Sequence, residues 1–419
     1  MKPLENPIND TLKIIKSGAV EIISEAELTA KLLENRPLRI KWGADPSAAD
    51  LHLGHFVILK KLKQLQVLGH EIIFLIGDFT ATIGDPSGRR ETRKPLSPQQ
   101  VKTNAETYEK QIFKVLDKKK TRVVFNSQWL APLALKDTIK LAASYTVARM
   151  LERNDFKERY QKQQDINIVE FLYPLLQGYD SVELKADLEI GGTDQKFNLL
   201  VGRALQKNYG QVPQVILTMP ILEGTDGTQK MSKSLGNYIA INDDPDNMFG
   251  KLMSIPDDLM PGYYELLTDL TFEPKTHPME AKKLLARTIT ATFWGQEAAV
   301  KAQEKFVSTF SKKQVPEDLP WEPFPLGSGI LFIMTDTVWQ EQYNFKLTNS
   351  LSDARRLIGQ GAVEYKKESE EKFTRITAPK FSFTEKGTYI LKVGKGKIVR
   401  LVIELKEIIL DPNGITGRT

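Results

Sequence analysis

Two histidines three residues apart, His52 and His55, are the side chains whose type and spacing most directly suggest chemistry. They lie in the stretch D-L-H-L-G-H at 50–55, between a short apolar alternation and a longer run with helical spacing, which predicts a strand, a tight loop and a long helix. Asp50 is the expected N-cap of that helix. The unpaired N–H groups of a helix start favour an anion, and neutral imidazoles can donate hydrogen bonds to phosphate oxygens. Gly54 has no Cβ to keep a flat ring off the backbone.

A His-x-x-His pattern is also compatible with a metal site or with two surface histidines. The chain contains four His and no Cys, so further imidazole or thiolate ligands are scarce. We therefore favour phosphate over metal and expect no protein-bound metal or organic cofactor.

Length and composition limit the class of protein. The 419 residues are enough for several domains, and the formal net charge is +5. There is no apolar run of membrane-spanning length and no signal or transit pattern at the N-terminus. The absence of Cys fits a reducing compartment, so we expect a cytoplasmic protein without a membrane partner.

A second apolar stretch at 71–78 predicts a buried strand, so that strand, helix and strand form a βαβ unit of a parallel sheet. Ligands of such sheets lie beyond the carboxyl ends of the strands. The loop that follows carries Asp85 with Arg89, Arg90 and Arg93, which is either an ordinary solvated turn or an anion clamp beside the histidines.

The following segments extend the same sheet. Residues 97–170 are mostly helical in pattern, with a short strand at 121–125, and are interpreted as an insertion between two halves of the sheet. Tyr173, Gln177 and Asp180 then share one face of a predicted helix. Strands are expected at 187–192, ending in two glycines, and at 213–222.

The loop 223–234, E-G-T-D-G-T-Q-K-M-S-K-S, carries Lys230 and Lys233 on either side of Met231 and Ser232. Its glycines predict mobility. Two lysines on a flexible loop are more often a solvated turn than a site, but their occurrence together with His52 and His55 changes that balance.

The motifs at 50–55 and 230–234 (K-M-S-K-S) together resemble the paired nucleotide-binding motifs of class I aminoacyl-tRNA synthetases. Within that class, I-G-D-P-S-G at 83–88, L-L-Q-G-Y-D at 175–180 and G-G-T-D-Q at 191–195 resemble the bacterial-type tyrosyl-tRNA synthetases. The resemblance extends over nearly the whole chain, and five motifs in this order are highly specific.

The resemblance implies a role for individual residues. Contacts to the ATP phosphates would come from His52, His55, Ser47, Lys230, Lys233, Arg89 and Arg93. Other ATP contacts would come from Gly43, Asp45, Gly54, Gly192, Asp194, Leu222 and Met231. The tyrosine pocket would contain Asp85, Tyr173 and Gln177 for the α-amino group, Gln195 for the carboxylate, and Asp180 for the phenol hydroxyl, with Lys41 beside it.

Three positions depart from the family pattern. Lys41 stands where many tyrosyl enzymes have Tyr, Glu189 where many have Gln, and Trp42 at a position that is often small. These departures leave it open whether Lys41 also reads the phenol.

The expected fold class is α/β: a Rossmann-like parallel-sheet catalytic domain at 1–234 with an inserted helical segment, then a helical anticodon-region domain at 235–320. A Pro-rich linker at 321–345 and a small α+β RNA-binding domain at 346–419 would follow. Residues 351–419 hold fourteen Lys or Arg against nine Asp or Glu. Arg355 and Arg356 are the candidate RNA contacts, and a solubilising appendage is the alternative.

The predicted function is therefore tyrosine–tRNA ligation, with L-tyrosine, ATP accompanied by Mg²⁺, and tRNA(Tyr) as partners. A homodimer is implied by the resemblance alone. Three alternatives stay open: a tryptophanyl-tRNA synthetase, a small-molecule adenylyltransferase, and a catalytically silent RNA-binding paralogue.

Overall fold

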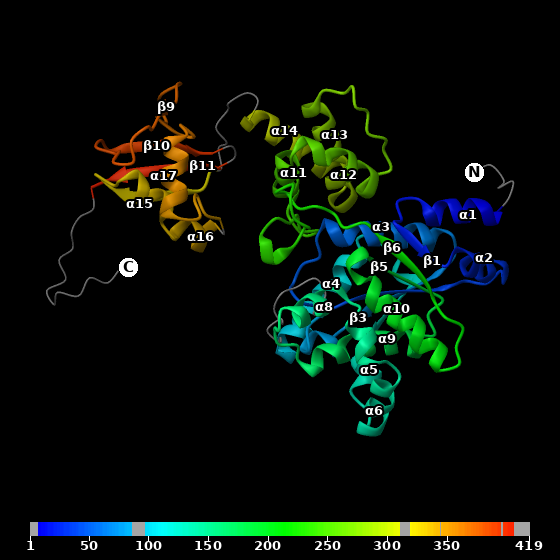
Figure 1. The fold of residues 1–419 in the computed structure, drawn as a ribbon. Coiled ribbons are helices and arrows are strands. Elements are labelled where there is room, and N and C mark those ends of the chain that lie inside the picture. Colours follow the sequence, from blue (N-terminus) through cyan, green and yellow to red (C-terminus); the bar gives the residue numbers. More distant parts are fainter. Residues whose placement is uncertain (1–6, 86–96, 311–318, 344, 395–396, 406–419) are drawn as a thin grey trace. The chain divides into compact units, whose positions relative to one another are not determined.

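The computed structural model describes residues 7–85, 97–310, 319–343, 345–394 and 397–405. The chain divides into two compact units, Met1–Val307 and Ser308–Thr419, and each is described by itself (Figure 1). No helix in these ranges is long and apolar enough to cross a membrane.

A six-stranded sheet in the order β1-β6-β5-β2-β3-β4 forms the centre of the first unit. Its strands are β1 (Glu21–Ile23), β2 (Arg39–Ala44), β3 (Glu71–Ile76), β4 (Thr121–Phe125), β5 (Leu188–Gly192) and β6 (Val215–Met219). Neighbouring strands from β6 to β4 are parallel, which confirms the predicted α/β class. β1 runs antiparallel to β6 and was missed, because three half-buried residues between two helices carry too short a pattern.

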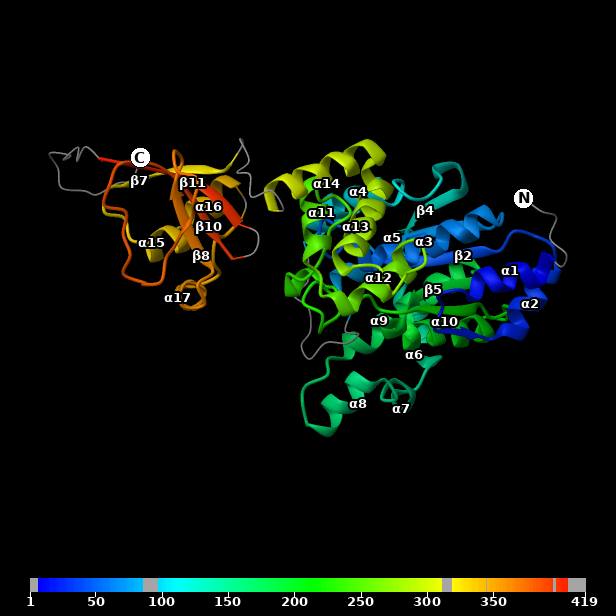
Figure 2. The same cartoon turned by 90° about the horizontal axis from the view of Figure 1, so that it is seen from above.

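Helices cover both faces of this sheet (Figure 2). Right-handed crossovers place two helices on opposite faces: α3 (Leu53–Val67), which joins β2 to β3, and α10 (Lys196–Asn208), which joins β5 to β6. The helices before the loop at 223–234 are α1 (Pro7–Lys16), α2 (Glu25–Leu33), α3 (Leu53–Val67), α4 (Pro98–Ile112), α5 (Ser127–Leu130), α6 (Leu135–Ala143), α7 (Val147–Met150), α8 (Asn154–Gln161), α9 (Ile168–Leu184) and α10 (Lys196–Asn208). Short 3₁₀ turns are η1 (Thr80–Thr82), η2 (Lys118–Lys120) and η3 (Thr193–Gln195).

The predicted insertion at 97–170 begins too early. β4 pairs in parallel with β3 along its whole length, so α4 and β4 continue the βαβ rhythm instead of interrupting it. The sequence between β4 and α9 is the part that departs from the rhythm, and it contains the short helices α5 to α8.

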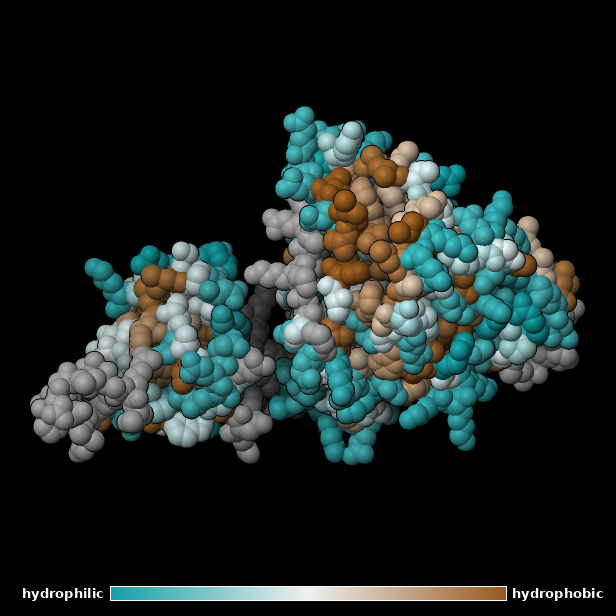
Figure 3. Space-filling view, turned by 90° about the horizontal axis from the view of Figure 1, so that it is seen from below, coloured by the Kyte–Doolittle hydropathy of each residue, from teal (hydrophilic) through white to brown (hydrophobic). Residues whose placement is uncertain are grey.

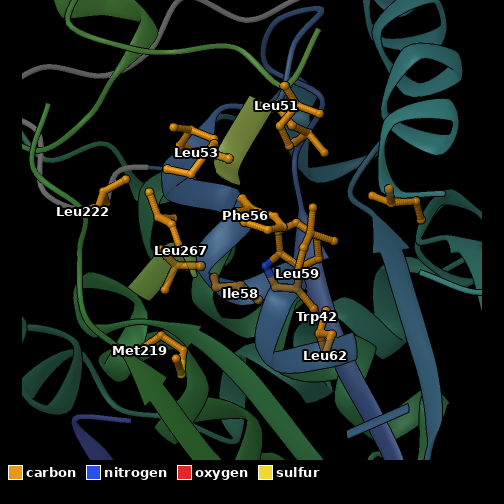
Figure 4. Packing of buried hydrophobic residues seen from close by; sticks show 14 of the residues in the cluster. Trp42, Leu51, Leu53, Phe56, Ile58, Leu59, Leu62, Met219, Leu222 and Leu267 are labelled. Atoms are coloured by element: carbon orange, nitrogen blue, oxygen red, sulfur yellow. The ribbon is translucent and has the colours of Figure 1, made fainter. Parts of the chain in front are cut away.

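After the loop at 223–234 the first unit is helical, as expected. It contains η4 (Lys233–Leu235), α11 (Pro245–Ser254), η5 (Asp257–Leu259), α12 (Met260–Leu267), α13 (Pro278–Trp294) and α14 (Gln296–Phe310). These helices share one hydrophobic core with the sheet. Figure 4 shows side chains of α3 beside Trp42 of β2 and Leu267 of α12. Phe56 meets Phe293 edge to face at 4.9 Å between ring centroids. The helical region is therefore continuous with the part of the first unit that contains the sheet.

The second unit contains a five-stranded sheet in the order β7-β11-β10-β8-β9. Its elements are β7 (Trp321–Pro325), α15 (Ile330–Thr335), α16 (Val338–Tyr343), α17 (Leu351–Gly359), β8 (Val363–Lys367), β9 (Thr374–Arg375), β10 (Gly387–Val393) and β11 (Lys397–Glu404). The predicted linker at 321–345 is wrong over its described residues. β7 pairs in parallel with β11, and Phe324 and Trp339 belong to this unit's core, so the prolines lie in a folded edge strand.

Candidate active site

A cavity of about 290 Å³ opens beyond the carboxyl ends of β2, β5 and β6, where the sheet topology predicts a ligand. It is lined by most of the candidate residues: Lys41, Gly43, Asp45, His52, Gly54, His55, Asp85, Tyr173, Gln177, Asp180, Gly192, Asp194, Gln195, Leu222, Lys230 and Met231. Ser47 and Lys233 are not part of this lining. Arg89 and Arg93 lie outside the described residues, and Arg355 and Arg356 belong to the second unit.

The two histidines form the start of α3. His52, not Asp50, is the N-cap: its Nδ1 accepts from the backbone N–H of Gly54 at 3.2 Å, and Nδ1 of His55 accepts from the N–H of His52 at 3.2 Å. Asp50 lies two residues too early to bond the first turn. A Cβ on Gly54 would lie 3.0 Å from the His52 ring, so the glycine avoids a tight contact with that ring.

These bonds determine the tautomer of both rings. Because each Nδ1 accepts a hydrogen bond, the proton of each neutral imidazole is assigned to Nε2. Burial, reinforced by Lys233 and Lys230, lowers the pKa of His52 to about 3, and burial beside His52 lowers the pKa of His55 well below its usual value. The pair is therefore neutral near pH 7 and keeps two Nε2–H donors.

The lysines of the loop meet different walls of the site. Lys230 pairs with Asp194 at 3.2 Å, whereas Lys233 donates to the backbone carbonyl of Asp50 and to the Tyr108 hydroxyl. Lys230 thus lies beside the end of β5, where it lines the cavity, and Lys233 lies beside the start of α3.

A hydrogen-bonded group of three side chains connects β2 to α9. The Tyr173 hydroxyl donates to Asp45 at 2.9 Å, and the Thr80 hydroxyl donates to the other Asp45 oxygen at 2.7 Å. Burial and the nearby carboxylate raise the pKa of Tyr173 well above its usual value, so it remains a phenol donor. A Cβ on Gly77 would lie 2.1 Å from Asp45, so this arrangement requires glycine there.

A second group orients Gln195. Its Nε2 donates to Asp85 at 2.9 Å, while its Oε1 accepts from Asn198 at 3.0 Å. The amide of Gln195 is thereby fixed with its N–H donors towards Asp85, which lines the same cavity.

Asp180 is 1% exposed and accepts from Trp129 Nε1 at 2.8 Å and from Asn126 Nδ2 at 3.3 Å. Burial raises its pKa to about 7, although Lys41, Trp129 and Asn126 act in the opposite direction. It is thus a carboxyl that changes charge near neutral pH inside the cavity wall. Asn126 and Trp129 were not predicted, because they lie more than fifty residues from Asp180 and belong to no recognisable motif.

Two of the departures from the family pattern prove to be one feature. Lys41 is fully buried and pairs with Glu189 at 2.8 Å. Its ammonium also donates to the Ser181 hydroxyl at 2.8 Å and to the Gln177 carbonyl at 3.0 Å. The three acceptors match the three N–H donors of an ammonium, so Lys41 has no remaining N–H for a substrate hydroxyl. The third departure, Trp42, packs on Phe74 at 5.0 Å between ring centroids and also lines the cavity.

The model of the family described as tRNA synthetases class I (W and Y) matches residues 33–311. The chain therefore belongs to the class I tRNA synthetases, as the paired motifs predicted.

Within that family, bacterial tyrosine–tRNA ligases match the chain almost end to end. That of Carboxydothermus hydrogenoformans is 50% identical over 411 residues, covering 94% of this chain and 98% of the relative. That of Aquifex aeolicus is 52% identical over 401 residues, with the same two coverages. The resemblance drawn from the five motifs is confirmed.

Solved structures agree on the fold. A C-terminally truncated mitochondrial tyrosyl-tRNA synthetase of Aspergillus nidulans superposes with a TM-score of 0.61 at 20% identity, covering 73% of this chain and 95% of that one. The tyrosyl-tRNA synthetase of Archaeoglobus fulgidus, solved with L-tyrosine, gives 0.58 at 25% identity, covering 71% and 99%.

Proposed function

We propose that this protein is a tyrosine–tRNA ligase, which activates L-tyrosine with ATP to tyrosyl-adenylate and then transfers the tyrosyl group to the 3′ end of tRNA(Tyr). The observation that carries the proposal is the buried carboxyl of Asp180 in the wall of the same cavity as the histidine pair. A carboxylate there accepts a phenol hydroxyl, and phosphate-binding groups lie at the start of α3. The similarity to tyrosine–tRNA ligases over 94% of the chain supports the same conclusion.

In the activation step the tyrosine carboxylate attacks the α-phosphorus of ATP and pyrophosphate leaves, so the protein supplies no nucleophile. Its contribution is position and charge. The neutral His52 and His55 present Nε2–H donors to the phosphates, and Lys230 and Lys233 compensate the charge that develops on the leaving pyrophosphate. ATP enters with its Mg²⁺ as substrate. Among the described residues no three His, Asp or Glu side chains are grouped as a metal site.

The amino acid is held by the groups that line the cavity around α9. Asp85, Tyr173 and Gln177 take the ammonium group, and the oriented Gln195 amide takes the carboxylate. Asp180 takes the phenol. Lys41 stabilises the pocket floor and does not read the hydroxyl, since its N–H groups are already donated.

The second unit serves tRNA binding. Arg355 and Arg356 are exposed on α17, where Arg356 also pairs with Asp353 at 2.5 Å. The positive balance of residues 351–419 supports phosphate contacts, which supply most of the salt-dependent affinity for RNA.

A homodimer is proposed from an apolar surface on the first unit. Figure 3 shows apolar atoms gathered over the part that carries α6 to α8. Strongly exposed residues of these helices are Leu135, Ile139, Val147 and Tyr160, and Ile168 at the start of α9 is exposed as well. Such a patch is typical of an interface, and a second copy of this chain is the occupant that the family resemblance supports. Replacing Leu135 and Ile168 by Asp should convert a dimer into a monomer in light scattering, and an unchanged mass would contradict this interface.

Amino-acid-dependent exchange of pyrophosphate into ATP tests the function. Tyrosine should support exchange without tRNA, and tyrosyl-tRNA should form when tRNA(Tyr) is added. Exchange with tryptophan alone would favour a tryptophanyl enzyme. Exchange with no amino acid would leave the small-molecule adenylyltransferase and the silent RNA-binding protein, of which only the latter would bind tRNA.

A further inference from the structure

The loop at 223–234, called the lysine loop below, begins as a hairpin-like turn. Glu223 and Lys230 form an antiparallel bridge, and the N–H of Gly224 donates to the Gln229 carbonyl at 2.7 Å. At the base of the turn the N–H of Met231 donates to the Leu222 carbonyl at 2.9 Å. Lys230 and Met231 therefore lie on the returning limb of a closed turn.

One side chain outside the turn joins its parts together. Asn237 is buried, and its amide donates to Asp226 at the tip at 2.8 Å and to the Lys230 carbonyl at 3.1 Å. Its Oδ1 accepts from the N–H of Ser232 at 2.8 Å. Both N–H donors and the carbonyl of the amide are thus used, each on a different segment of the loop.

The backbone of the outgoing limb is fitted to the same residue. The N–H of Thr225 donates to the Asn237 carbonyl at 2.9 Å, and a Cβ on Gly224 would lie 2.2 Å from the Asn237 amide nitrogen. Gly224 is therefore needed for close contact with Asn237. This differs from the sequence-based interpretation of Gly224 as a source of mobility.

We propose that Asn237 is a positioning residue for the activation step: it locks the limb that presents Lys230 and Met231 to the cavity. Lys233 lies beyond the lock and is held instead by Asp50 and Tyr108, so the two lysines are positioned by separate contacts. This inference rests on the proposed role of Lys230 in compensating charge on the phosphates.

The first test is Asn237→Asp, which keeps the size of the side chain. It removes both N–H donors and places a carboxylate against Asp226 and the Lys230 carbonyl. We expect the single-turnover rate of tyrosyl-adenylate formation to fall by roughly tenfold or more, because the two hydrogen bonds that the Asn237 amide donates are replaced by repulsive contacts. The dissociation constant for tyrosine without ATP should change by less than about twofold, since Asn237 does not touch that part of the cavity.

A second variant distinguishes positioning from a general loss of structure. In Asn237→Asp combined with Asp226→Asn, the donor and acceptor are exchanged and the bond between the two side chains can form again. Because the bond to the Lys230 carbonyl is not restored, we expect partial recovery of the rate. Asn247→Asp is the matched control: it makes the same change of charge on an exposed Asn that bonds Asp244 on α11, and should leave the rate unchanged.

Lys230→Ala, measured in parallel, separates this inference from the proposed function. If Lys230→Ala slows adenylate formation and Asn237→Asp does not, the positioning role is wrong. If neither variant slows it, the proposed role of the loop is wrong and the inference falls with it. A loss of tyrosine affinity and of thermal midpoint in Asn237→Asp, without recovery in the exchanged pair, would show a merely structural residue.

Discussion

The proposed phenol contact of Asp180 and its raised pKa can both be tested with Asp180→Asn. Its carboxyl is 1% exposed, so the folded protein disfavours the charged form and the pKa is about 7 instead of the ordinary 3.8. Between these two pH values the folded protein keeps the Asp180 proton, whereas the unfolded chain has released it. The free energy of unfolding therefore decreases as pH rises through this interval. The variant has no such proton to lose.

The magnitude follows from the shift. A rise from 3.8 to about 7 corresponds to roughly 4 kcal/mol in total, of which about 2.5 kcal/mol falls between about pH 5 and about pH 8. The unfolding free energy of the unaltered chain should drop by that amount relative to Asp180→Asn over this interval. Contributions from His52 and other groups are common to both chains and cancel in the difference.

Urea denaturation of both chains at the two pH values measures this difference, and tyrosine binding supplies a second readout. In the proposed complex the phenol hydroxyl donates to the charged carboxylate, so tyrosine affinity should weaken below pH 7 in the unaltered chain. In Asp180→Asn the affinity should be lower and flat with pH. Parallel stability profiles for the two chains would refute the raised pKa. A lost pH dependence of stability combined with unaltered tyrosine affinity would refute the assignment of Asp180 to the phenol.

Three further predictions concern the other parts of the molecule. Lys41→Met leaves the buried Glu189 carboxylate without its partner and should lower the free energy of unfolding by about 3–5 kcal/mol in urea denaturation. Lys41→Met combined with Glu189→Met removes that unpaired charge and should recover most of the loss. Lys233→Ala should lower the rate of adenylate formation more than tyrosine affinity in single-turnover kinetics, and the reverse pattern would place Lys233 in the amino-acid pocket. Removing residues 311–419 should leave tyrosine-dependent pyrophosphate exchange nearly intact but abolish most tRNA charging, and an equal loss of both would show that the second unit supports the catalytic unit.

The sequence predicted the parts of the site that lie close to one another in the chain. His52, Gly54 and His55 occupy one helix start, and Tyr173 to Asp180 one helix face, so local spacing already fixes their relation. The parallel sheet followed from two apolar strands around a helix. These features brought most of the expected residues to one cavity.

What the sequence did not reveal depends on contacts between distant segments. Thr80 in η1 contacts Asp45, and Asn126 and Trp129 at α5 contact Asp180, and no motif in the surrounding sequence marks these residues. The same limit explains the linker error, because prolines at 323 and 325 suggest a loop unless β11 is known to pair beside them. The N-cap error is local: a histidine replaced the usual Asp because its ring can accept from the first turn.

Lys41 and Glu189 show that two departures from a family pattern can compensate each other and have to be interpreted together. Taken alone, a lysine in the floor of a phenol pocket suggests an altered specificity, since it could donate to the hydroxyl. β2 and β5 are neighbours in the sheet, and Lys41 lies directly beside Glu189 in the register, so the new cation and the new anion neutralise each other. Lys41 also donates to the Ser181 hydroxyl and to the Gln177 carbonyl, which lie next to Asp180 and one helical turn before it on α9. In the proposed tyrosine pocket this leaves Asp180 as the residue that accepts the phenol hydroxyl, although two neighbouring residues differ from the family pattern.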